Sequence, residues 1–182
     1  EAGTCGVGYN SLRFDDSFTR NLLYRNFHDP YRREYANGNS RWDLIDLVRM
    51  CYALRPAGIE WPRRDDGVAS FKLDDLAAAN RLREGMAHEA LSDVRATIAL
   101  ARLVRAKQRR LFDWYLGLRD KQAALKLLDW KQRTPVVHVS SKFPAARGHL
   151  SIVLPLGVLP DQANAIVAYD LAVDPRPLLE LD

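Results

Sequence analysis

Asp15 is the first residue whose type and place suggest chemistry. The stretch Asn10-Ser11-Leu12-Arg13-Phe14-Asp15 lies where a strand-like run passes into a helix-like run. A carboxylate at such a junction can project into a cleft at the end of the strand. The plainer alternative is that Asp15 caps the helix while Phe14 beside it packs into the core.

His88 and Asp93 form the second candidate pair, in the stretch His88-Glu89-Ala90-Leu91-Ser92-Asp93 that leads into an amphipathic helix. Two residues five apart on an α-helix point roughly 140° apart. They can therefore converge on one site only if His88 lies outside the regular helix. In that case Asp93 would be a fixed metal ligand and His88 a base. The alternative is a surface histidine and an aspartate placed in the first turn of a helix.

These three side chains fit one kind of reaction, the two-metal hydrolysis of a phosphate ester. That reaction needs several carboxylates around two Mg²⁺ ions about 4 Å apart, one activating water and the other stabilising the leaving oxygen. Magnesium prefers oxygen ligands, and a histidine can accept the proton of the attacking water. Asp15, Asp93 and His88 would supply three of the required groups, with Mg²⁺ as the expected metal and Mn²⁺ as a substitute.

The surrounding pattern predicts the elements that position these groups. Gly- and Asn-rich or Pro-rich composition predicts loops at residues 28–41 and 56–70. Apolar periodicity predicts a short buried strand, four helices, two short helices and then three strands. These lie, in order, at residues 4–9; 15–27, 44–54, 73–80 and 92–105; within 109–134; and at 135–140, 150–154 and 164–169. A helix-rich part followed by a strand-rich part predicts a domain boundary near residues 108–115.

Composition narrows the class of protein. With 47% hydrophobic and 27% charged residues, the chain has the balance of a soluble globular protein. It has no apolar run of the roughly 20 residues that span a bilayer, so we expect no membrane association. A net charge of +4 is compatible with a polyanionic partner without requiring one.

Cys5 and Cys51 are expected to be buried free thiols of a reducing compartment, the cytoplasm. Four separated histidines without a Cys-x-x-Cys argue against structural zinc.

The two motifs together resemble the second and third motifs of the DEDD superfamily of 3′→5′ exonucleases, in its histidine subtype. The chain is similar in particular to bacterial exonuclease I, collinearly from about residue 6 to the end. The similar segments are 8–16, 19–21, 24–27, 29–31, 39–43, 51–56, 110–113 and 178–182. The resemblance implies an α/β fold, with the C-terminal part of a ribonuclease H-like exonuclease domain over residues 1–108. A mostly β SH3-like domain, beginning with linker helices, would occupy residues 109–182. The resemblance also makes Asp15 and Asp93 metal ligands and His88 the general base.

One family motif is missing from the sequence. The superfamily's first motif, Asp-x-Glu, supplies two further metal ligands, and no Asp-x-Glu occurs in the 182 residues. We expect this motif upstream of Glu1 and the family's helical C-terminal domain beyond Asp182, so that the chain is an internal piece. By itself, the chain is then expected to show little nuclease activity.

Candidate contacts to single-stranded DNA follow the same reasoning. Such binding uses cations along the backbone and aromatic faces for the bases. The resemblance implies a DNA channel along the segments that carry Arg20, Tyr31, Tyr35 and Arg49, and Tyr35 stands where the family often has another aromatic residue. Lys72 occupies a basic position that could hold the phosphate of the 3′-terminal nucleotide. In the second domain Lys121, Asn164 and Arg147 could continue the channel. For any one of these residues, a solvated face or ordinary packing is the alternative.

Two functions remain open. The first is an Mg²⁺-dependent exonuclease that releases 5′-mononucleotides from single-stranded DNA. It would act in DNA repair and recombination, as a monomer, with single-stranded-DNA-binding protein as a partner. The second is a non-catalytic single-strand binder of the same fold. A proofreading subunit or ribonuclease T would share the two motifs but would not explain the SH3-like half.

Overall fold

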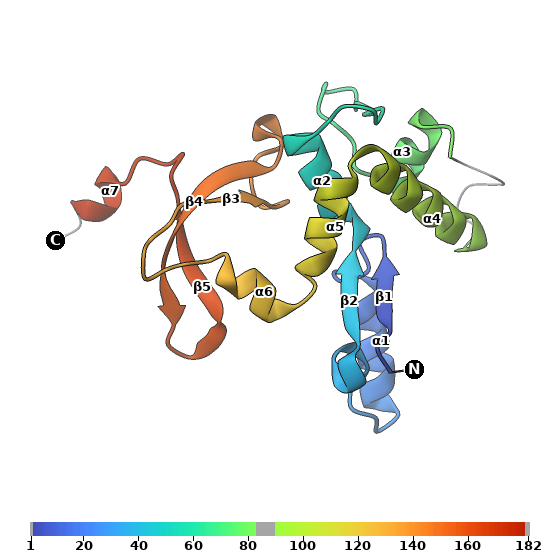
Figure 1. Cartoon of the computed structure of the whole chain (residues 1–182), viewed down its shortest axis with the longest axis horizontal. Coiled ribbons are helices and arrows are strands. Elements are labelled where there is room, and N and C mark those ends of the chain that lie inside the picture. The colour runs from blue at the N-terminus through green and yellow to red at the C-terminus, as the bar shows by residue number, and fades with distance from the viewer. Residues whose placement is uncertain (1, 83–89, 181–182) are drawn as a thin grey trace. The chain divides into compact units, whose positions relative to one another are not determined.

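The computed structural model describes residues 2–82 and 90–180, and the chain forms two compact units, Glu1–Asp120 and Lys121–Asp182 (Figure 1). The first unit contains β1 (Cys5–Gly8), α1 (Asp15–Arg25), the 3-10 turns η1 (Arg32–Glu34) and η2 (Ala36–Gly38), β2 (Ser40–Asp43), α2 (Leu44–Leu54), α3 (Leu73–Ala79), α4 (Ala90–Lys107) and α5 (Arg109–Gly117). The second contains α6 (Lys121–Lys126), β3 (Val136–Val139), the 3-10 turn η3 (Ala145–Arg147), β4 (Leu150–Leu159), β5 (Gln162–Asp170) and α7 (Arg176–Leu179). None of the described helices combines the length and apolar character needed to cross a membrane.

The two strands of the first unit run side by side and parallel (Figure 1). Gly6 of β1 lies opposite Arg41 of β2 in the register, and Gly8 lies opposite Asp43. The predicted strand at residues 4–9 is confirmed, but Val7 is 52% exposed and so is not buried as expected. The loop predicted at residues 28–41 is wrong at its end, because Ser40 and Arg41 belong to β2.

Four helices of the first unit confirm the predicted ranges to within a few residues at each end. In α2 the apolar side chains recur at helical spacing, and Leu44, Leu47, Val48 and Cys51 are all buried. The helix begins where Asp43 caps it, accepting a hydrogen bond from the Ile45 amide at 3.2 Å.

The long helix α4 buries one stripe of residues spaced four apart: Ser92, Ala96, Leu100 and Val104. Leu100 and Val104 join Leu47, Val48 and Leu76 in the core of the first unit. This spacing places all four side chains on one face of the helix. The rotation of α4 about its own axis is therefore fixed by the core.

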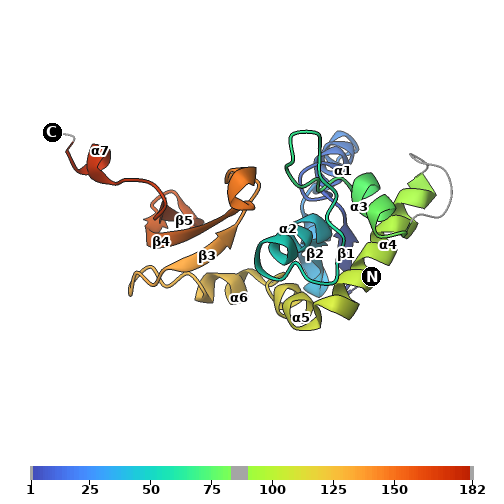
Figure 2. The ribbon, with the colours of Figure 1, turned by 90° about the horizontal axis from the view of Figure 1, so that it is seen from above.

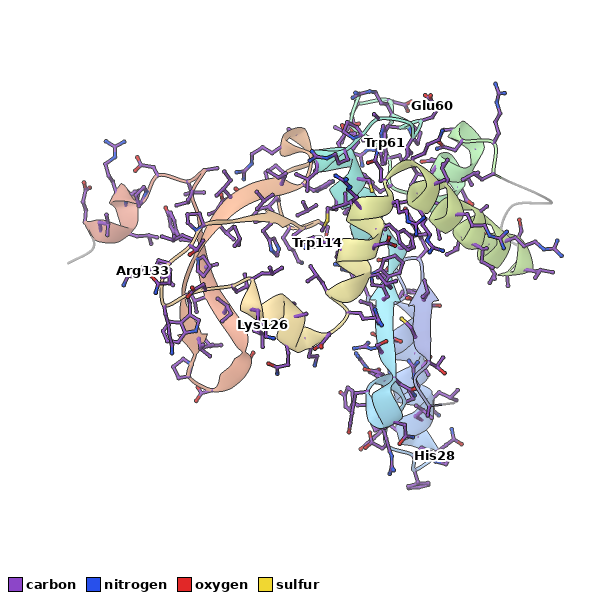
Figure 3. All side chains as sticks on the ribbon, viewed as in Figure 1. His28, Glu60, Trp61, Trp114, Lys126 and Arg133 are labelled. Atoms are coloured by element: carbon purple, nitrogen blue, oxygen red, sulfur yellow. The ribbon has the colours of Figure 1, made fainter. Side chains whose placement is uncertain are left out.

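The core also takes in α5, into which α4 leads directly (Figure 2). Trp42 of β2 is only 4% exposed, and its ring centroid lies 5.1 Å from that of Phe112 and 5.7 Å from that of Tyr115. By these contacts α5 packs on the core of the first unit. In the loop between α2 and α3, Trp61 (Figure 3) stacks edge-on against Tyr52 at 5.2 Å.

The second unit is built on a three-stranded antiparallel sheet in the order β3-β4-β5. Val136 lies opposite Val153, and Val153 lies opposite Asp170. All three predicted strands are confirmed, and β4 extends to Leu159, beyond its predicted end. Lys126 ends α6, the second of the two short helices expected after residue 108 (Figure 3).

Candidate active site

A cavity of about 1030 Å³ lies within the first unit, and both candidate metal ligands line it. Its wall is formed by β1, by the junction that follows it, by the first turns of α1 and by one side of α4. Asp15 comes from α1 and Asp93 from α4, so residues distant in the sequence meet at one cavity. The α4 side chains on this wall are Ala90, Asp93, Val94, Thr97, Ile98, Ala101, Arg102 and Arg105.

Asp15 is the first residue of α1 and is exposed at the cavity. The N-cap position belongs to Phe14, whose side chain cannot cap a helix and is 58% exposed. The alternative of a capping Asp15 beside a core phenylalanine is therefore wrong. The turn before the helix is tight: Asn10 has a left-handed φ of 61°, and the Asp16 amide donates to the Ser11 carbonyl at 2.9 Å.

Asp93 lies in the first turn of α4, as the sequence predicts, and is half-buried. It faces the cavity because the neighbouring stripe, from Ser92 to Val104, is held in the core. Thr97, one turn later on the same wall, donates its hydroxyl to the Asp93 carbonyl at 2.8 Å. His88 lies outside the described residues, so its role as the base stays a prediction.

Beside Asp15 lies a set of ion pairs that was not predicted, here called the Asp16–Glu34 network (Asp16, Arg20, Arg33, Glu34, Arg41). Asp16 accepts hydrogen bonds from Arg33, at 2.6 Å, and from Arg41. Glu34 accepts two from Arg20, at 2.8 and 3.0 Å, and pairs with Arg41 at 3.0 Å. Both carboxylates are buried, with side chains only 9% and 6% exposed. Burial alone would raise the pKa of Asp16, but the hydrogen bonds from Arg41 and Arg33 outweigh it and hold that pKa below its ordinary value.

The junction leading to Asp15 is fixed by Asp43 and Tyr9. Asp43 accepts backbone hydrogen bonds from Asn10 at 2.7 Å and from Leu12 at 3.1 Å. The hydroxyl of Tyr9 donates to the Phe71 carbonyl at 2.7 Å, and burial raises the pKa of Tyr9 well above its usual range. Burial also raises the pKa of Asp43, although three backbone amides oppose this shift. The turn that precedes α1 is thus anchored at both ends.

The side chains of the site have the ligand chemistry that a divalent metal requires. Asp15 and Asp93 both line the cavity, and carboxylate oxygens are the ligands that Mg²⁺ prefers. Within residues 2–82 and 90–180, no three His, Cys, Asp or Glu side chains gather closely enough to hold an ion. The described residues therefore supply part of a ligand set.

The predicted DNA contacts of the first unit occupy different environments. Tyr31 and Tyr35 are 54% and 64% exposed, and the Arg20 guanidinium lies over the Tyr31 ring at 5.1 Å. The structure therefore brings Arg20 and Tyr31 together. Arg49 is mostly buried, pairing with Asp46 at 3.0 Å. Lys72 is exposed immediately before α3.

The candidates in the second unit come from three different elements, α6, η3 and β5. Lys121 is exposed at the start of α6, and Asn164 lies in β5, with a side chain outside those that the structure describes. Arg147 pairs with Asp170 at 3.3 Å. No contact between these residues and DNA is tested by the structure, so their roles stay predictions.

Comparison with known proteins supplies close relatives. "Exodeoxyribonuclease I" of Escherichia coli (strain K12) is 52% identical over 179 residues, which are 98% of this chain and 38% of that protein. The protein of the same name from Haemophilus influenzae is 48% identical over 179 residues, again 98% of this chain and 38% of the relative. The chain thus spans about two fifths of the length of these curated relatives.

Solved structures agree with this similarity. E. coli exonuclease I in complex with a dA16 oligonucleotide superposes with a TM-score of 0.97 at 52% identity, covering 100% of this chain and 39% of that one. An exonuclease I/SSB-Ct complex superposes with a TM-score of 0.95 at 50% identity, covering 100% of this chain and 39% of that one.

Two family models match consecutive parts of the chain. The model described as "Exonuclease I SH3-like domain" matches residues 119–182. The model described as "Exonuclease" matches residues 1–101, more than half of the 182 residues. The chain therefore belongs to the exonuclease family and carries, in order, an exonuclease domain and the SH3-like domain of exonuclease I.

Proposed function

We propose that the whole protein to which this chain belongs, called the encoded protein below, is an Mg²⁺-dependent 3′→5′ exonuclease. It would degrade single-stranded DNA to 5′-mononucleotides. The observation that carries the proposal is the meeting of Asp15 and Asp93 at one cavity within an exonuclease-family domain. Two carboxylates that line one cavity can contribute to the ligand set of a divalent ion or of two neighbouring ions.

In this proposal each side chain has a separate task. Asp15 and Asp93 hold and orient the metal, and His88 accepts the proton of the attacking water. When bound, Mg²⁺ would supply the charge that activates the water and stabilises the leaving 3′ oxygen. Arg102 and Arg105, on the same wall of α4, add positive charge that attracts a phosphate backbone towards the carboxylates.

Single-stranded DNA is the proposed substrate. The exposed rings of Tyr31 and Tyr35 can stack on bases, since base–aromatic stacking tolerates any sequence. Lys72 would hold the phosphate of the terminal nucleotide, with Arg20 and Arg49 along the strand. Lys121 and Asn164 would continue the path in the second domain. Support for a DNA substrate comes from the E. coli relative, whose complex contains a dA16 oligonucleotide.

The proposed setting follows from the same relatives and from the cysteines. Single-stranded-DNA-binding protein is a proposed partner, supported by the exonuclease I/SSB-Ct complex. The enzyme would act as a monomer in DNA repair and recombination. Free thiols at Cys5 and Cys51 suit the reducing cytoplasm. Residues 1–108 would serve as the exonuclease part and residues 109–182 as the SH3-like part, with α5, at the start of the second range, packed on the core of the first unit.

The test uses the encoded protein with a 5′-labelled single-stranded oligonucleotide and Mg²⁺. A 3′→5′ exonuclease gives a ladder of labelled fragments shortening from the 3′ end, and a 3′-labelled strand releases its label as a mononucleotide at once. Asp93→Asn and Asp15→Asn should each lower kcat by at least 100-fold, because each removes a metal ligand.

The matched control is Asp65→Asn, which removes an exposed carboxylate from the loop between α2 and α3, away from the cavity. This variant should turn over like wild type. Near-normal turnover by Asp93→Asn, or label release from the 5′ end first, would refute the proposal.

A further inference from the structure

Asp15 and Asp16 are consecutive and both line the cavity, yet they stand in opposite environments. Asp15 is exposed at the wall, whereas Asp16 is buried and bound by two guanidinium groups. A carboxylate already satisfied by two arginines is poorly placed to serve as a metal ligand itself. The two carboxylates are therefore suited to different roles. Asp15 is available to a ligand in the cavity, whereas Asp16 is bound to other side chains of the protein.

The partners of Asp16 come from parts of the chain that must be brought together by folding. Arg33 lies in η1 and Arg41 in β2, so Asp16 ties the first turn of α1 to both. Glu34 repeats the arrangement one turn along, joining Arg20 of α1 to Arg41. Arg41 thus bridges the two carboxylates, and α1 is held at Asp16 and again at Arg20.

The placement of Asp15 depends on this double attachment. Successive residues of an α-helix are rotated by about 100° and displaced by about 1.5 Å, so fixing Asp16 fixes the direction in which Asp15 leaves the helix.

We infer that the Asp16–Glu34 network is a positioning device that holds the Asp15 carboxylate at the cavity wall in the geometry needed to bind metal. The inference deepens the proposed function and rests on it. Functional groups must be held to within about 0.5 Å of their productive geometry, and partners that orient a metal ligand commonly affect metal affinity by about 10–100-fold. In this reading Asp16, Glu34 and Arg41 are positioning residues that touch neither substrate nor metal.

The experiment measures metal binding directly, by titrating the encoded protein with Mn²⁺ and detecting the free ion by electron paramagnetic resonance. The dependence of turnover on Mg²⁺ concentration is measured in parallel. Asp16→Asn keeps the shape of the side chain but removes its charge. We expect it to weaken Mn²⁺ binding about 10–100-fold and to raise the Mg²⁺ concentration for half-maximal kcat by a similar factor. KM for the oligonucleotide at saturating metal should change by less than about threefold, because the inference assigns Asp16 no contact with DNA.

Arg41→Lys is the second variant, in case Asp16→Asn does not fold. Lysine keeps the charge but cannot bridge two carboxylates with a planar fork, so metal binding should again weaken. Asp66→Asn is the control: Asp66 pairs with Arg64 at 2.9 Å on the loop between α2 and α3 and does not line the cavity. A purely stabilising network would lower the unfolding temperature while leaving the Mn²⁺ affinity of the folded variants unchanged.

The two hypotheses fail in different ways. If Asp15→Asn weakens Mn²⁺ binding while folded Asp16→Asn and Arg41→Lys bind like wild type, the positioning role is overturned and the proposed function stands. If Asp15→Asn and Asp93→Asn both bind Mn²⁺ like wild type, the metal site itself is wrong and the proposed function falls with the inference.

Discussion

The carboxylate of Asp43 accepts a hydrogen bond from the backbone amide of Asn10 at 2.7 Å, joining the end of β2 to the turn that follows β1. The same side chain accepts from Leu12 and caps α2 at Ile45. One buried aspartate therefore fixes the start of the core helix α2 and the loop that delivers Asp15 to the cavity.

Removal of this aspartate should be costly. We expect Asp43→Ala to lower the free energy of unfolding by about 2–5 kcal/mol, since it deletes a helix cap and leaves two partly buried amides without acceptors. Asp43→Asn should lose less, because the amide oxygen can still accept. Urea denaturation measures both. Asp113→Ala, at an exposed i,i+4 pair with Arg109, serves as the comparison and should change stability by less than about 0.5 kcal/mol. An Asp43→Ala variant as stable as Asp113→Ala would contradict this account.

The depressed pKa of Asp16 predicts a pH dependence of stability. Because the pKa is lower in the folded than in the unfolded chain, the ionised carboxylate stabilises the fold at neutral pH. This contribution is fully present above the unfolded pKa of about 3.9 and is lost as the pH falls through the lower folded value. The difference in unfolding free energy between wild type and Asp16→Asn should therefore stay constant above about pH 5 and shrink as the pH falls from there through the unfolded pKa of about 3.9 and below the folded pKa of Asp16. A difference that stays constant across this range would argue against the ion pairs as its source.

Metal should stabilise the folded protein as well as support turnover. A ligand present at about 100 times its dissociation constant adds about 2.7 kcal/mol to stability. Mg²⁺ is thus expected to raise the unfolding temperature of the encoded wild-type protein reversibly, with EDTA restoring the lower value and abolishing nuclease activity. Asp15→Asn should show a much smaller rise, measured by differential scanning calorimetry. Equal rises in the two proteins would place the bound ion elsewhere.

The exposed ring of Tyr35 is expected to contribute to single-strand affinity. Loss of a stacked base costs about 1–3 kcal/mol, so Tyr35→Ala should weaken binding of an oligo-dT strand by about 5–150-fold in fluorescence anisotropy. Tyr35→Phe keeps the ring and should bind within about threefold of wild type. If Tyr35→Ala and Tyr35→Phe weakened binding equally, the result would contradict a stacking role for the Tyr35 ring.

Cys51 should be protected from alkylation while the first unit is folded. It is fully buried, and burial raises the pKa of its thiol to about 12. At pH 8, iodoacetamide should therefore modify Cys51 only after urea unfolds the chain, as followed by mass spectrometry of the peptides. The half-buried Cys5 provides the internal comparison. Labelling of Cys51 in native protein at its unfolded rate would show that this part of the core opens readily.

The sequence predicts well those elements whose own pattern suffices to define them. The range of α2 follows from buried Leu44, Leu47, Val48 and Cys51 and from the Arg55-Pro56 stop. The strands β3 to β5 follow from β-branched runs between turns. By contrast the sequence does not predict β2, because Ser-Arg-Trp-Asp carries no alternating apolar pattern. Its extended conformation comes from pairing with β1, a contact between residues some 35 positions apart.

The candidate site divides in the same way. Asp15 and Asp93 could be selected from their motifs, and the structure brings both to one cavity. The Asp16–Glu34 network could not be predicted from the sequence, because ion pairs between distant segments impose no regular spacing on their residues. The adjacent Asp15-Asp16 and the Arg-Arg-Glu of residues 32–34 were visible as charges, but nothing local indicates which of them are buried together.

The stripe that α4 buries, from Ser92 to Val104, limits which sequence changes this helix can tolerate during evolution. Shifting the register of this helix by a single residue would turn Asp93 by about 100° away from the cavity. Insertions or deletions within α4 are therefore as damaging to the site as the loss of Asp93 itself. Substitutions along the stripe leave the length of the helix unchanged, so they keep Asp93 directed at the cavity as long as the new side chains still pack in the core. Natural variation in this helix should accordingly accumulate by replacement and not by change of length.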